Sequence, residues 1–155
     1  MSRQPDKRPP AYLGGEPYIF VSYARKNAAL VYPHLAALRA EGFRLWYDRE
    51  GIPPGEEWWE IIGGALVKAS SFLLFLSPAA AASPNVRREL NLALKYRLPI
   101  TYVYLAETAL SPGLELQLGP IQSLCAYDYP DPAAFYQKLF WALPDKTCAG
   151  RRPQE

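Results

Sequence analysis

Short apolar runs alternate along this chain with longer segments of helical periodicity. The runs at 71–76 and 100–105 are apolar on both faces, as expected of strands buried inside a parallel sheet. Strands separated by helix-length segments predict a sheet with helices on both sides, here a five-stranded doubly wound α/β fold. The expected strands are 18–23, 44–47, 71–76, 100–105 and 124–127, and the expected helices are 27–41, 57–69, 84–96 and 132–143, with an irregular connection at 107–120.

Proline and glycine mark the exceptions to this pattern. Pro33 lies inside the first helical segment and should kink that helix or delay its start. Gly63 and Gly64 lie inside the second and are expected to permit close packing. Residues 1–16 and 145–155 lack periodicity and are rich in polar residues, proline and glycine, so we expect a folded domain at 17–144 between two flexible tails.

Composition narrows the class of protein. The 155 residues, half of them hydrophobic, suffice for one core and one domain. The 17 basic and 15 acidic residues form no basic stripe, so no nucleic-acid partner is expected. No segment has the length of a membrane span, so no membrane contact is expected. Cys125 and Cys148 give neither a disulfide framework nor metal-ligand spacing, which favours a cytoplasmic protein without a metal; His34 is interpreted as structural.

Polar residues gather where the ligand site of such a fold is expected. In a flavodoxin-like sheet of order 2-1-3-4-5, ligands bind beyond the carboxyl ends of strands one and three. The first expected strand ends at Ser22-Tyr23, followed by Arg25, and the second ends at Tyr47-Asp48. A turn-rich loop from residue 49 to Trp58-Trp59 follows, which is typical of a lid or a contact surface.

Glu89 is the strongest candidate for chemistry. Ser83 suits a helix N-cap and Pro84 the first helical position, so Glu89 lies about a turn and a half into the helix. Its neighbours three and four positions away are Asn85, Val86, Leu92 and Ala93, none of which is a cation. The common helical ion pair is therefore absent, although a solvated surface glutamate remains an alternative.

These pieces together resemble the Toll/interleukin-1 receptor (TIR) domain in its bacterial form. The resemblance covers nearly all of residues 18–143. The matching motifs are Phe20-Val21-Ser22-Tyr23, Trp46-Tyr47-Asp48, the loop through Ile52-Pro53-Pro54-Gly55 to Trp58, the strand and serine at 72–77, and the helix start at 83–90.

The resemblance implies an enzyme, because many TIR domains cleave the nicotinamide–ribose bond of NAD to give ADP-ribose or a cyclised or conjugated form of it. Glu89 matches their catalytic glutamate, and NAD is then substrate, with no other cofactor. Asn85 departs from the family, since many members carry Trp there. The expected substrate-binding residues are Ser22, Tyr23, Arg25, Tyr47, Asp48, Trp58, Ser83 and Asn85.

The resemblance also implies self-association through TIR–TIR contacts, a downstream effector that senses the nucleotide product, and a role in antiphage defence. Trp58 or Trp59, expected to be exposed, would anchor such contacts. The main alternative is a non-enzymatic TIR–TIR interaction module. A phospho-receiver domain is disfavoured, because the first strand lacks an acidic pair and the third ends in Ser77 rather than Asp.

Overall fold

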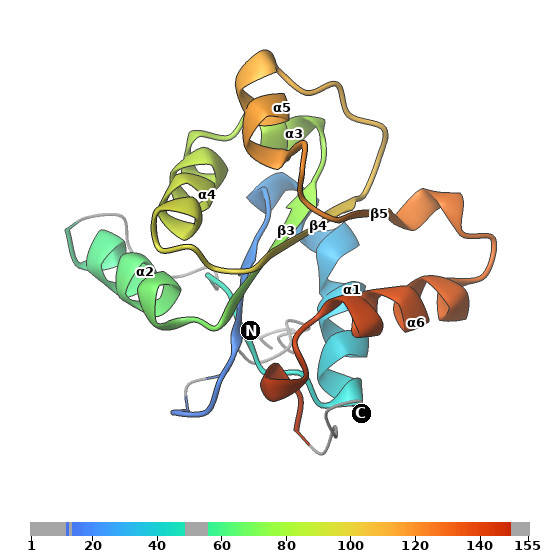
Figure 1. Cartoon of the computed structure of the whole chain (residues 1–155), viewed down its shortest axis with the longest axis horizontal. Coiled ribbons are helices and arrows are strands. Elements are labelled where there is room, and N and C mark those ends of the chain that lie inside the picture. The colour runs from blue at the N-terminus through green and yellow to red at the C-terminus, as the bar shows by residue number, and fades with distance from the viewer. Residues whose placement is uncertain (1–11, 13, 49–55, 150–155) are drawn as a thin grey trace, which may run out of the picture.

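The computed structural model describes residue 12 and residues 14–48 and 56–149. Its sheet has five parallel strands in the order β2-β1-β3-β4-β5, which confirms the predicted fold class. Figure 1 labels the neighbouring strands β3, β4 and β5. The register places Ile19 beside both Leu45 and Ser71, so β1 lies between β2 and β3. The strands are β1 (Ile19–Ser22), β2 (Leu45–Trp46), β3 (Ser71–Leu76), β4 (Ile100–Tyr104) and β5 (Ser123–Cys125).

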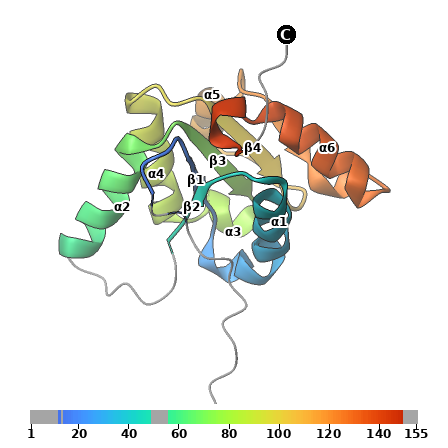
Figure 2. The same ribbon diagram turned by 90° about the horizontal axis from the view of Figure 1, so that it is seen from below.

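Helices cover both faces of the sheet. One face carries α1 and α6, and the other carries α2 to α5 (Figure 2). The helices are α1 (Ala28–Glu41), α2 (Glu56–Lys68), α3 (Pro78–Ala81), α4 (Pro84–Lys95), α5 (Pro112–Leu118) and α6 (Pro132–Ala142), with 3-10 turns η1 (Arg25–Asn27), η2 (Ala126–Asp128) and η3 (Asp145–Thr147). No helix among the described residues is both long and apolar enough to cross a membrane.

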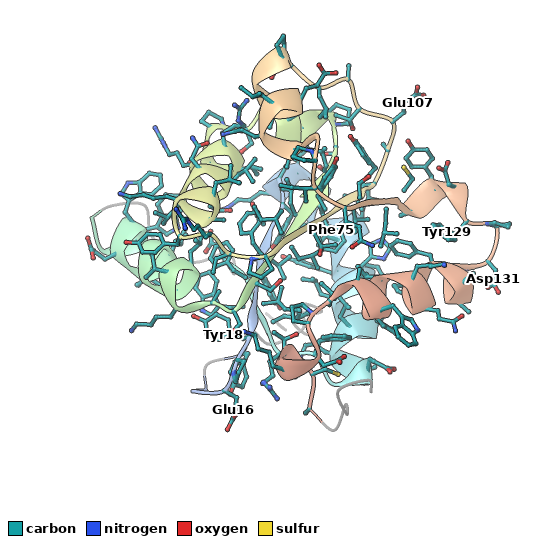
Figure 3. All side chains as sticks on the ribbon, viewed as in Figure 1. Glu16, Tyr18, Phe75, Glu107, Tyr129 and Asp131 are labelled. Carbon is teal, nitrogen blue, oxygen red and sulfur yellow. The ribbon has the colours of Figure 1, made fainter. Side chains whose placement is uncertain are left out.

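The alternation of side chains along β3 divides the core into two layers. Phe72 and Leu74 pack toward α2 and α4, whereas Leu73 and Phe75 pack toward α1 and α6. Figure 3 labels Phe75 among the side chains of the interior. His34 on α1 stacks on Phe75 with ring centroids 5.7 Å apart, in agreement with a structural role. Burial on both faces is what makes β3 a continuous apolar run.

Two expectations about local structure are wrong, and one alternative for α1 is excluded. The connection at 107–120 is not irregular throughout, because Ser111 caps α5 by accepting a hydrogen bond from the Leu114 N–H at 3.3 Å. Helix α1 begins at Ala28 with Pro33 inside it, so of the two effects expected of Pro33 the delayed start does not occur, and the kink stays a prediction. Gly63 and Gly64 do not serve close packing, because a Cβ at either position would meet no atom within 4 Å.

The expectation of a flexible C-terminal tail is also wrong for residues 145–149. Thr147 and Cys148 are buried, and the Arg44 N–H donates to the Thr147 carbonyl at 2.9 Å. On the outer side of β2, the Tyr12 N–H donates to the Leu45 carbonyl at 2.6 Å. Backbone pairing with the chain around β2 therefore orders residues 145–149, which no local periodicity could indicate.

Candidate functional site

A cleft of about 370 Å³ lies at the carboxyl end of β1, the position predicted for the ligand site. Elements far apart in sequence meet there: the residues after β1, the end of β2, and helices α2, α3 and α4. The residues 49–55 of the predicted loop lie outside the described part of the chain. The lining residues are Val21, Tyr23, Ala24, Arg25, Lys26, Asp48, Trp58, Ala79, Ala82, Ser83, Asn85, Val86 and Glu89.

Local structure at the start of α4 aims Glu89 at this cleft. The Ser83 hydroxyl accepts a hydrogen bond from the Val86 N–H at 3.2 Å, which confirms its predicted role as N-cap. Val86 and Leu90 are buried against the sheet, and Glu89 is partly buried at the edge of that stripe. Glu89 therefore does not lie on the solvated face of the helix.

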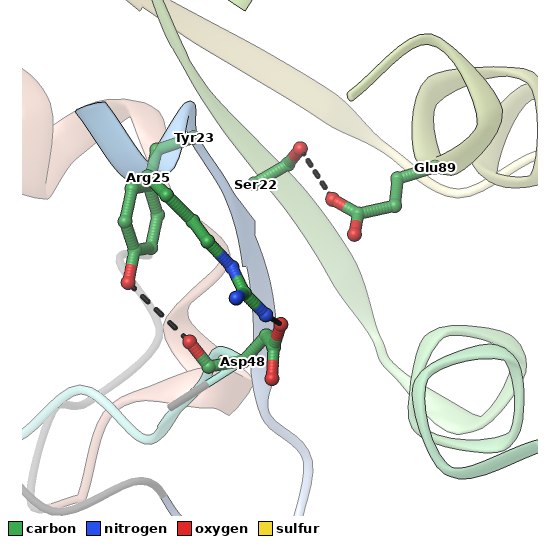
Figure 4. Close-up of polar contacts among 5 residues, drawn as sticks. All are labelled: Ser22, Tyr23, Arg25, Asp48 and Glu89. Carbon is green, nitrogen blue, oxygen red and sulfur yellow. Dashed lines mark hydrogen bonds and ion pairs between the residues drawn. The ribbon is translucent and has the colours of Figure 1, made fainter. Parts of the chain in front are cut away.

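The carboxylate of Glu89 is held by the first strand. The buried Ser22 hydroxyl donates to Glu89 Oε1 at 2.7 Å (Figure 4). Burial raises the pKa of Glu89 from 4.5 to about 7; the Ser22 hydrogen bond opposes that rise, Asp48 adds to it and Arg25 opposes it. Near neutral pH, Glu89 consequently exists in both protonation states.

Arg25 and Asp48 form an ion pair at the cleft. The Arg25 guanidinium donates to Asp48 Oδ2 at 2.7 Å, with side-chain exposures of 53% and 16%. The Tyr23 hydroxyl donates to the backbone carbonyl of Asp48 at 3.4 Å, and burial raises the pKa of Tyr23 above its usual range. The three residues thus tie the loop after β1 to the end of β2 (Figure 4).

The aromatic residues are arranged differently from the expectation. Trp58 lines the cleft but is 7% exposed, so of the two tryptophans offered as the exposed anchor, Trp58 is not the exposed one. Trp59 is 45% exposed, and the Arg88 guanidinium lies 5.1 Å from the centre of its ring. Tyr47 does not line the cleft: it is buried on the opposite face of the sheet beside Tyr23, with ring centroids 6.5 Å apart, and its assignment to substrate binding is wrong.

The remaining wall comes from small and polar side chains. Ser83 and Asn85 line the cleft, and Asn85 is exposed and accepts a hydrogen bond from Arg88 at 3.4 Å. Sequence reasoning missed Lys26 and the short helix α3. The Ser77-Pro78 pair was a sufficient signal for α3, because it repeats the Ser-Pro start that identified α4.

Fold and site together define a doubly wound α/β domain with a carboxylate cleft at its switch point. A profile of the TIR domain matches residues 19–140, and the chain belongs to this family. The TIR domain of the Toll-related receptor TRR-2 from Hydra magnipapillata has a similar fold, with a TM-score of 0.64 and 18% identity over 79% of this chain and 94% of that chain. No curated protein sequence matches the chain.

Proposed function

We propose that this TIR domain cleaves the nicotinamide–ribose bond of NAD, with Glu89 as the catalytic carboxylate. The observation that carries the proposal is the placement of Glu89 in the cleft at the end of β1, hydrogen-bonded to Ser22 at 2.7 Å. A carboxylate held in a partly desolvated cleft is suited to stabilising positive charge that develops on a substrate.

Cleavage of the nicotinamide–ribose bond requires few groups besides Glu89. The C–N bond breaks with its electron pair going to the nicotinamide nitrogen, which leaves as a neutral molecule and needs no acid. Positive charge develops on the ribose, where an ionised Glu89 stabilises it. Water then adds to the ribose and releases a proton, so that NAD⁺ and water give nicotinamide, ADP-ribose and H⁺. Attack by a group of the ADP-ribose itself in place of water gives a cyclic product.

The other residues lining the cleft have properties suited to the rest of NAD. Arg25 and Lys26 are exposed cations after β1 that suit the pyrophosphate. Trp58 offers an aromatic surface for a flat ring. Position 85 offers none, because Asn85 stands where many family members carry Trp. An ADP-ribose-type product would be the signal that a downstream effector senses, as the antiphage role implied by the resemblance requires.

The test is nicotinamide release from NAD at high protein concentration. We expect turnover by the wild-type protein, none by Glu89→Gln, and unchanged turnover by Glu60→Gln, which removes an exposed carboxylate from α2. Glu89→Gln keeps an oxygen that can accept from Ser22, so it isolates the loss of charge. A folded Glu89→Gln variant with wild-type turnover would refute the role of Glu89.

A second candidate function is a TIR–TIR interaction module without turnover. It is favoured by the exposed Trp59 on α2 and by the similarity of the fold to that of a Toll-related receptor domain. Sedimentation over a hundredfold range of concentration tests it, with Trp59→Ala expected to weaken association. Self-association combined with wild-type turnover that rises with concentration would show that the two functions coexist.

A further inference from the structure

Ser22 occupies an unusual position for a serine. It is the last residue of β1, pairs in register with Leu74 of β3, and is 1% exposed. Its hydroxyl donates to Glu89 Oε1 at 2.7 Å across 67 positions of sequence. Among the described residues, Ser22 is the one hydrogen-bonding partner found for the Glu89 carboxylate.

Ser22 and Glu89 are each fixed by rigid structure. β1 is flanked by β2 and β3, and α4 packs on the sheet through Val86 and Leu90. Because a glutamate side chain has several rotatable bonds, a single fixed oxygen removes much of its freedom. Figure 4 shows the second carboxylate oxygen directed away from Ser22. Ser22 itself does not line the cleft, so it would act on a substrate through Glu89.

We infer that Ser22 is the positioning residue of Glu89: its hydroxyl holds one carboxylate oxygen, leaves the other for the substrate and favours the ionised form. The structure contradicts the direct substrate-binding role expected for Ser22. The catalytic part of this inference rests on the proposed function, whereas the coupling between Ser22 and Glu89 is a property of the folded protein alone.

The surrounding charges act on Glu89 in both directions. Asp48, after β2, disfavours the ionised carboxylate, and Arg25, after β1, favours it. Lys26 also lines the cleft, and the side that α2 contributes is the uncharged Trp58. A hydrogen bond donated to the charged form lowers a carboxyl pKa, so Ser22 lowers the Glu89 pKa as Arg25 does. Unlike Arg25, Ser22 carries no charge that would bind the phosphates of a substrate.

The test compares three variants of the whole chain. Ser22→Ala removes the donor, and Ser22→Cys fills the same space with a weaker donor. Ser71→Ala is the matched control, because Ser71 is equally buried at the opposite end of the sheet and its hydroxyl donates to the Pro99 carbonyl at 3.3 Å. Two readouts are needed: the Glu89 carboxyl pKa from ¹³C NMR, and the pH profile of kcat/KM for nicotinamide release.

We expect Ser22→Ala to raise the Glu89 pKa by about half to one pH unit and to move the acid limb of the profile equally. At pH 6, kcat/KM should fall about tenfold or more. Ser22→Cys should give a smaller shift in the same direction, and Ser71→Ala none.

An unchanged pKa and profile in Ser22→Ala would overturn the inference, as would equal effects of Ser71→Ala. If Ser22→Ala does not fold, the titration of Ser22→Cys decides, and a pKa identical to wild type refutes the coupling. If the wild-type protein releases no nicotinamide while the NMR shift is observed, the proposed function is overturned and the coupling between Ser22 and Glu89 stands.

Discussion

Replacing Glu89 by Gln should stabilise the folded protein at pH 8 and have little effect at pH 4.5. Burial raises the pKa of Glu89 from 4.5 to about 7 in the folded protein. Between pH 4.5 and about pH 7, the folded protein keeps a proton on Glu89 that the unfolded chain releases. The free energy of unfolding of the wild type therefore falls as pH rises from about 4.5 to about 7 and is level above that range. Glutamine does not titrate, so the Glu89→Gln variant does not lose this free energy of unfolding.

The magnitude follows from the shift in pKa. One pKa unit corresponds to about 1.4 kcal/mol, so the rise from 4.5 to about 7 sets an upper limit of about 3 kcal/mol. Glu89 is only partly buried, and solvent screening reduces this value. We expect Glu89→Gln to be more stable than wild type by about 1–3 kcal/mol at pH 8.

Urea unfolding followed by circular dichroism, at several pH values from 4.5 to 8, measures the difference. Glu60→Gln serves as control, because that carboxylate is exposed on α2 and its removal should give a small difference that does not grow with pH. A Glu89→Gln variant that is less stable than wild type at pH 8, or whose difference from wild type is the same at every pH, would refute the reasoning that burial raises this pKa.

The pH dependence of activity, the two tryptophans of α2 and its two glycines each give a further prediction. Nicotinamide release should rise with pH through about 7, because the ionised form of Glu89 is the active one; a rate that is flat or falls from pH 6 to 8 would contradict this. Trp58→Ala should cost about 3–5 kcal/mol of stability and Trp59→Ala less than about 1 kcal/mol, measured by urea unfolding, since Trp58 is buried and Trp59 is exposed. Gly63→Ala and Gly64→Ala should each raise stability by about 0.5–1 kcal/mol, because both positions are helical with open space beside them; a loss would point to an unseen contact.

The sheet could be predicted from sequence because burial on both faces leaves long apolar runs, of which β3 is the clearest. β2 is only two residues long, too short for alternation to show which face the next residue occupies. Trp46 packs toward α2 and Tyr47 toward α1. Because the sequence does not show this difference, Tyr47 was wrongly assigned to the site. Short strands carry too few positions to reveal a period.

The starts of several helices share one sequence signal. Three helices begin with the same pair, a capping serine and a proline at the first helical position. The pair led to the prediction of α4, but α3 and α5 were missed because they are short and show little periodicity. The pairs are Ser77-Pro78, Ser83-Pro84 and Ser111-Pro112.

The candidate site could be predicted only in part. Glu89 was found because its own helix offers it no cation three or four positions away, which is a local property. Its hydrogen bond to Ser22 and the pairing of Arg25 with Asp48 depend on how strands and helices meet in space. No spacing along the chain indicates such contacts, and the topology alone brings them to one edge of the sheet.

The backbone pairing around β2 has a consequence for how copies of this domain could assemble. An edge strand with free N–H and C=O groups invites strand addition by another chain. Here the outward carbonyl of Leu45 is occupied by Tyr12, and the N–H of Arg44 by Thr147. A strand added at this edge would have to displace Tyr12 from the Leu45 carbonyl and Thr147 from the Arg44 N–H. Among the described residues, contacts from the β2 side that leave this pairing intact would rely on side chains rather than on these main-chain groups.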